Sequence, residues 1–112
     1  MTKPSGSFLL VLTNLPDQDI AKRLAESLVE KRLAACVNIL DGCTSVYRWQ
    51  GDIQNDREIP MLIKTHVDRF AQAREEILRL HPYEVPEIVA VPISQGLEPY
   101  LQWIAASVDL SS

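Results

Sequence analysis

The sequence predicts an α+β fold, and three features support this expectation. Short segments rich in aliphatic and β-branched residues alternate with segments of helical periodicity. Hydrophobic residues make up 46% and charged residues 23% of the 112 residues, which is ordinary for one globular domain. A long strand-turn-strand stretch occupies the middle of the chain. We expect residues 8–112 to form a single domain behind a disordered tail at residues 1–7.

A strand and then a helix are predicted first. Phe8–Thr13 is an unbroken apolar run, which is typical of a central strand buried on both faces. Pro16 and the acidic Asp17 then open a helix, and Lys31 and Arg32 close its last turn. The apolar positions of this helix recur at helical spacing and are Ile20, Ala21, Leu24, Ala25 and Leu28.

Two long β segments joined by a tight turn follow the first helix. Ala34–Leu40 is apolar and partly β-branched, Asp41-Gly42 marks a bend or bulge, and Thr44–Trp49 resumes with period-two alternation. Gln50-Gly51-Asp52 is typical of a tight turn, after which Ile53–Thr65 returns along the first arm. These residues predict one long hairpin.

The last part of the chain adds a helix, a strand and a final helix. The second helix is predicted from Val67 to Leu80, because Pro82 disfavours the α conformation at the residue before it. Ile88–Ile93 has the composition of a strand, and Pro99–Val108 that of a terminal helix. The resulting order, β-α-β-β-α-β plus a helix, is that of a ferredoxin-like sandwich with a long central hairpin.

The length of the hairpin predicts an oligomer. The arms at 34–50 and 51–65 are about three times the usual strand length, and at about 3.3 Å per residue each could extend nearly 50 Å. A bare hairpin of that length would expose unpaired edge groups, which soluble proteins avoid. Pro60 cannot donate a ladder hydrogen bond, which predicts a bulge or an edge position there. We therefore expect another subunit to pair with the hairpin.

Composition and motifs argue against several classes of function. The formal net charge of −4 argues against nucleic acid as a partner. No apolar run reaches the length of a membrane span, so we expect no membrane partner. No common catalytic motif is present, so we expect no enzyme. The apolar run after Lys3 is too short for a signal peptide. Cys36 and Cys43 are expected to stay free thiols, which is typical of a reducing compartment. We therefore expect a cytoplasmic protein.

Several motifs, in order and at consistent spacing, cover nearly the whole chain. The most recognisable is His81-Pro82-Tyr83-Glu84-Val85-Pro86-Glu87-Ile88. The others are Arg32-Leu33-Ala34-Ala35-Cys36-Val37-Asn38, Ser45-Val46-Tyr47-Arg48-Trp49-Gln50-Gly51, Leu62-Ile63-Lys64-Thr65, and Tyr100 with Leu101 and Trp103. Together they resemble the CutA family, small proteins named for divalent-cation tolerance.

The resemblance implies a tightly interlocked homotrimer, in which long hairpins complete the sheets of neighbouring subunits. It also implies a role in tolerance to copper and other divalent ions, with no cofactor required. Two positions depart from ligands proposed for copper in other members. Thr13 stands where some carry a cysteine, and Leu80 where some carry a second histidine. We therefore expect copper or another divalent cation to bind weakly.

His81 and Cys36 are the candidate metal ligands, because imidazole and thiolate suit copper and zinc. Each also has a structural interpretation. His81 could be a positively charged residue that interacts favourably with the negative end of the helix dipole, and Cys36 could be a small buried hydrophobe. The intervening helix would hold His66 roughly 22 Å from His81, so the two could meet only across an interface.

A second candidate group could line an intersubunit cleft that binds a small ligand or a cation. Its members are Trp49, Glu58, Lys64, Tyr83, Glu84 and Glu87. The alternative is that the carboxylates make interface salt bridges and that Trp49, with Tyr47, anchors a subunit contact. Two other functions therefore stay open. One is a trimeric sensor resembling the PII signalling proteins, and the other is a purely structural or partner-scaffolding trimer.

Overall fold

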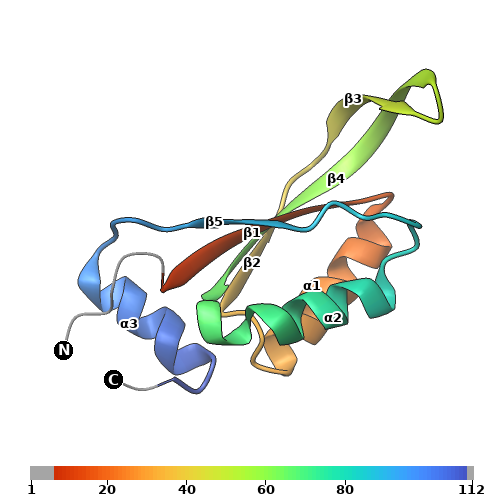
Figure 1. The fold of residues 1–112 in the computed structure, drawn as a ribbon. Helices are drawn as coiled ribbons and strands as arrows, with labels where there is room; N and C mark the ends of the chain where they lie inside the picture. The colour runs from red at the N-terminus through yellow and green to blue at the C-terminus, as the bar shows by residue number, and fades with distance from the viewer. Residues whose placement is uncertain (1–6, 111–112) are drawn as a thin grey trace.

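The computed structural model describes residues 7–110, which form an elongated molecule of 50 × 25 × 23 Å (Figure 1). Only Ser7 of the predicted tail at 1–7 is among them, and its carbonyl accepts from Val67 N at 2.7 Å. The rest of that prediction lies outside the described residues. The elements are β1 Phe8–Leu15, α1 Gln18–Glu30, β2 Cys36–Ile39, β3 Cys43–Trp49, β4 Asp52–His66, a 3-10 turn Val67–Arg69, α2 Phe70–Leu80, β5 Val89–Pro92 and α3 Glu98–Ser107.

The strands form an antiparallel sheet in the order β2-β4-β1-β5, and β3 pairs with the outer half of β4. This is the ferredoxin-like order, with β2 and β3 together supplying the second strand. Helices α1 and α2 cover one face of the sheet (Figure 1), where Leu24, Leu28, Ile63 and Ile77 are fully buried. The predicted α+β fold is confirmed.

The other face of the sheet is largely uncovered. Helix α3 packs on one end of it through Ile104 and Val108, which contact Phe8. Residues paired across strands share a face, so the pairs Leu10–Val91 and Leu12–Val89 both lie on this side. We call the uncovered part the open face, and it consists of Leu10, Leu12, Cys36, Asn38, Leu62, Lys64, Val89 and Val91.

A bulge separates β2 from β3, as predicted for Asp41-Gly42. Ile39 faces Met61, whereas Cys43 faces Glu58. Residues 40–42 therefore lie opposite residues 59–60, which leaves one extra residue on the β2–β3 side.

Pro60 lies inside the sheet rather than at an edge, and the bulge that it predicts is on the opposite strand. β4 keeps a continuous register with β1 at this point, where Pro60 pairs with Asn14. The Pro60 carbonyl accepts a hydrogen bond from Leu40 N at 3.0 Å. In an antiparallel pair of this kind the second hydrogen bond runs from the N–H of residue 60 to the Leu40 carbonyl, and proline has no N–H to make it. Gln18 Nε2 donates to that carbonyl instead, at 3.2 Å.

The ends of the elements differ from the predictions by up to three residues. The largest difference is at α2, which was predicted from Val67 but begins at Phe70, because Val67–Arg69 forms a 3-10 turn. β1 continues through Leu15, because its last residues still pair with β4. Arg32 lies just beyond α1 with φ 58°, and Leu33 N bonds back to the Leu28 carbonyl at 2.9 Å, which is a Schellman end. At the hairpin tip Gln50 and Gly51 both have positive φ, as a two-residue turn requires. Within residues 7–110, no helix has the length and apolar character needed to cross a membrane.

Candidate functional site

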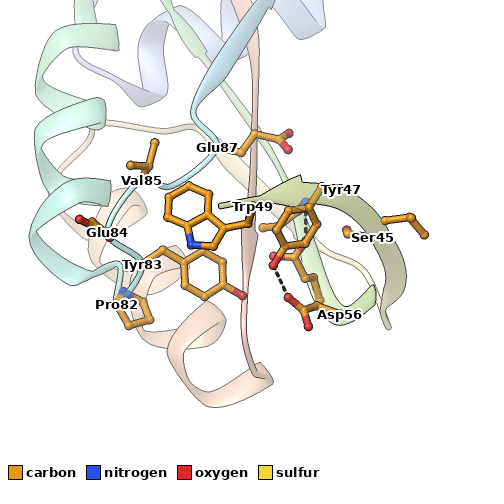
Figure 2. Close-up of a pocket in the computed structure, with 12 residues that line it drawn as sticks. Ser45, Tyr47, Trp49, Asp56, Pro82, Tyr83, Glu84, Val85 and Glu87 are labelled. Atoms are coloured by element: carbon orange, nitrogen blue, oxygen red, sulfur yellow. Dashed lines mark hydrogen bonds between the residues drawn. The ribbon is translucent and has the colours of Figure 1, made fainter. Parts of the chain in front are cut away.

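A cavity of about 730 Å³ lies where the hairpin leaves the sheet, on the same side as the open face (Figure 2). One wall is the hairpin β3–β4, and the other is the loop between α2 and β5. Strand pairing aligns Ser45 with Asp56 and places Cys43 opposite Glu58, so alternate residues of both arms point to this side. The lining residues are Asn14, Ser45, Val46, Tyr47, Trp49, Asp56, Glu58, Pro82, Tyr83, Glu84, Val85 and Glu87.

Three aromatic rings form much of the wall. In Figure 2 the Trp49 indole points from the hairpin toward the loop that carries Tyr83 and Val85. The Tyr47 hydroxyl donates to the Asp56 carboxylate, and this hydrogen bond raises the pKa of Tyr47. The rings thus come from two segments that are far apart in the sequence.

Glu58 is the most buried charged residue of the cavity, with 8% of its surface exposed. Asn14 Nδ2 donates to its Oε1 at 3.4 Å, and the Tyr83 hydroxyl lies near enough to this carboxylate for the two groups to interact. Burial, together with the neighbouring Glu58 carboxylate, raises the pKa of Tyr83 to about 12. The groups nearest the Glu58 carboxylate are therefore neutral, and among residues 7–110 no basic residue lines the cavity.

His81 fastens the loop to β1 from a buried position, with 8% of its surface exposed. Its Nδ1 accepts from Tyr83 N at 3.2 Å, so Nε2 carries the proton and donates to the Asn14 carbonyl at 2.6 Å. Desolvation lowers the pKa of His81, which favours the neutral ring that this arrangement needs. Both ring nitrogens are thus engaged by backbone groups, and the residue does not sit at an exposed helix end as a charged group.

The structure does not bring the two predicted metal ligands together within one chain. Cys36 lies level with Leu10 of β1, because both residues pair with Lys64 of β4. His81 is hydrogen-bonded to Asn14, which is four residues further along β1. At about 3.4 Å per residue, this offset alone is about 14 Å. In the described part of the chain, no three His, Cys, Asp or Glu side chains converge as a metal would need. Both cysteines are free thiols, as predicted.

Five of the six residues predicted for the cleft do line the cavity: Trp49, Glu58, Tyr83, Glu84 and Glu87. Lys64 lies elsewhere, on the open face, with its Nζ 5.8 Å from the centre of the Tyr100 ring of α3. Sequence reasoning missed Asn14 and Asp56. Period-two pairing along the hairpin would have placed Asp56 beside Glu58, but no local signal points to Asn14.

These features define a ferredoxin-like α+β protein with an extended hairpin and an acidic, aromatic cavity at its base. The family described as CutA1 divalent ion tolerance protein matches residues 9–107, and the chain belongs to that family. The divalent-cation tolerance protein CutA of Thermus thermophilus is 50% identical over 95 residues, which cover 85% of this chain and 92% of that protein.

Other relatives differ in length or setting. Protein CutA of Mus musculus is 43% identical over 88% of this chain, but the match spans only 56% of the mouse protein. The crystal structure of CutA from Xylella fastidiosa has a TM-score of 0.90 at 43% identity, over 92% of this chain and 99% of that one. A structure from Archaeoglobus fulgidus, described as a periplasmic divalent cation tolerance protein, has a TM-score of 0.88 at 39% identity, over 90% of this chain and 98% of that one.

Proposed function

We propose that this protein acts as a homotrimer in divalent-cation tolerance, that it binds copper or another divalent ion weakly, and that it works by binding rather than by catalysis. Membership of a family named for divalent ion tolerance supports the general role. The trimer, the ion and the weak affinity are the proposed details.

The open face is the observation that carries the trimer. It presents Leu10, Leu12 and Leu62 together with Val89 and Val91, which are 47% and 44% exposed. The hairpin beyond it exposes Val46 and Ile53 to 64% and 56%. The exposed apolar residues of the open face mark an interface. Val46 and Ile53 lie on the other face of the hairpin, since they share the side of Asn55 rather than that of Glu58. Burying both surfaces against two further copies would also cover the edges of the hairpin.

The proposed metal ion takes ligands from more than one subunit. Cys36 is half-buried on the open face, so a trimer that covers this face brings the thiol to the subunit contact. His81 would have to give up a backbone hydrogen bond to coordinate, which makes it a poor ligand in this conformation. An incomplete or shared site of this kind gives modest affinity. Two free thiols favour a reducing compartment, and we place the protein in the cytoplasm.

Light scattering and copper titration test the proposal. The protein at micromolar concentration should scatter as three chains, and a stable monomer would contradict the trimer. Copper binding should weaken in Cys36→Ser, while Cys43→Ser, the matched control on β3, should behave as the wild type. Equal copper binding by both variants and by His81→Ala would remove Cys36 and His81 as ligands.

The cavity favours a second candidate, a sensor that binds a small molecule. Its volume of about 730 Å³ falls within the range of small-molecule sites. A thermal-shift screen with small metabolites tests this, since a ligand that binds only the folded protein raises its melting temperature.

A further inference from the structure

The charge of the cavity restricts what it can bind. In the described part of the chain, the only charged residues that line it are four carboxylates, Asp56, Glu58, Glu84 and Glu87. No lysine, arginine or histidine between positions 7 and 110 lines it. An anion such as a nucleotide phosphate would be repelled by this lining, whereas a cation would be attracted.

Glu58 lacks the partner that a buried carboxylate usually has. It is more than nine-tenths buried, and its neighbours are the Asn14 amide and the Tyr83 hydroxyl, both neutral. Among residues 7–110 no lysine, arginine or histidine forms an ion pair with it. Buried charges in proteins are normally paired with an opposite charge. A cation in the cavity would provide that pairing.

The aromatic lining indicates which kind of cation. Tyr47, Trp49 and Tyr83 bring three rings to the cavity, and Figure 2 shows the Trp49 and Tyr83 rings on its hairpin and loop walls. The negative faces of such rings attract organic ammonium groups, and aromatic cages that recognise methylated ammonium use this effect. The aliphatic Val85 and Pro82 add apolar contacts for the carbon atoms of such a ligand.

The size of the cavity also favours an organic cation over a bare metal ion. About 730 Å³ is ample for a molecule of many atoms, whereas calcium needs six or more oxygens at about 2.3–2.6 Å. The four carboxylates are spread over the hairpin and the loop, and no three of the acidic side chains in the described part of the chain converge in that way.

We propose that this cavity binds an organic amine or quaternary ammonium ion, with Glu58 as its buried charge partner and the Trp49 and Tyr83 rings against its apolar surface. All the residues involved belong to one chain. The site is therefore separate from the proposed shared metal site at Cys36, and either one can be wrong without the other.

Calorimetric titration with choline and with its neutral isostere 3,3-dimethylbutan-1-ol tests the charge requirement on the unmodified protein. Choline should saturate one site per chain and bind about tenfold more tightly than the alcohol, because the two differ in the positive charge alone. No saturable binding of choline, or equal binding of the two compounds, would overturn the proposal.

Two variants with the same charge change locate the site. Glu58→Gln should weaken choline binding about tenfold. Glu26→Gln, at an exposed position of α1 on the far side of the sheet, should bind choline as the wild type does. Unchanged binding in Glu58→Gln would place any choline site elsewhere and refute the assignment. Copper titration of the same Glu58→Gln sample should match the wild type, which separates this result from the metal proposal.

Discussion

At the scale of single residues, His81 is a positioning residue. Its ring joins Asn14 on β1 to Tyr83 in the loop, and Asn14 and His81 are 67 positions apart in the sequence. These two hydrogen bonds need a neutral imidazole, because a protonated Nδ1 cannot accept from the Tyr83 N–H. The proton on His81 is thereby linked to the shape of the cavity that Tyr83 lines.

His81 predicts a loss of stability at mildly acidic pH. Burial lowers its pKa below the usual 6.5, although the Asn14 carbonyl and Glu58 act in the opposite direction. The unfolded chain therefore binds the proton more readily, and the free energy of unfolding should fall as pH drops from 6.5 toward the lower pKa of the folded state. Urea denaturation between pH 7.5 and 5 measures this. His81→Gln should show a shallower slope, and equal slopes would contradict this role.

Thr13 predicts a stabilising substitution. Its side chain is buried with 1% exposed, and its Oγ1 has no hydrogen-bond partner in the described part of the chain. Thr13→Val keeps the shape and removes the buried hydroxyl, so the free energy of unfolding should rise by about 1 kcal/mol. Thr65→Val is the matched control. Thr65 is equally buried, but its hydroxyl donates to the Leu33 carbonyl at 2.7 Å, so the same change should destabilise the protein in urea denaturation. A loss of stability in both would refute the account of Thr13.

At the scale of elements, Glu76 joins the two helices that cover the sheet. Its carboxylate accepts from Ser27 Oγ and from Lys31 Nζ at 3.1 Å, both near the end of α1. On α2 itself, Arg79 donates through Nε at 2.9 Å and through its terminal nitrogen at 2.6 Å. The hydrogen bonds from Arg79 have the largest effect on the pKa of Glu76. Together with those from Ser27 and Lys31, they outweigh burial, which would raise this pKa, and lower it to about 2.

Glu76 should support stability above pH 4.5 and lose this effect in stronger acid. Its pKa is lower in the folded protein than the usual 4.5, so its contribution is complete above 4.5 and disappears as pH falls toward about 2. The stability difference between the wild type and Glu76→Gln should therefore be greatest at pH 7 and shrink below pH 4.5. Glu75→Gln, at the exposed neighbouring position, should show no such change. A difference that does not depend on pH would contradict this assignment.

The elements were predictable where the signal was local. The apolar run from Phe8 predicted a strand, and Gln50-Gly51 predicted the hairpin tip, and both are present in the structure. What the sequence did not show depends on long-range contacts. The burial of His81 requires Asn14, and the place of Lys64 requires Tyr100 of α3, neither of which leaves a trace in the neighbouring sequence.

At the scale of the whole molecule, the two faces of the sheet differ in what covers them. α1 and α2 cover one face, while the open face keeps half-exposed valines on β5 beside the leucines of β1. The same side carries the cavity at the base of the hairpin. A trimer that covers the open face would therefore set its subunit contacts next to the cavity, so that binding in the cavity and assembly could influence each other.

A pair of matched substitutions tests whether the open face is the subunit contact. Val91 on β5 and Leu78 on α2 are 44% and 46% exposed in the single chain, so lysine at either position costs little in a monomer. In a trimer that covers the open face, Val91→Lys places three ammonium groups in a buried contact, which is strongly unfavourable. Val91→Lys should therefore scatter light as a smaller species and melt at a lower temperature, because assembly and stability are linked. Leu78→Lys should remain a trimer with an unchanged melting temperature. A Val91→Lys protein that remains trimeric would show that the subunits meet through a different surface.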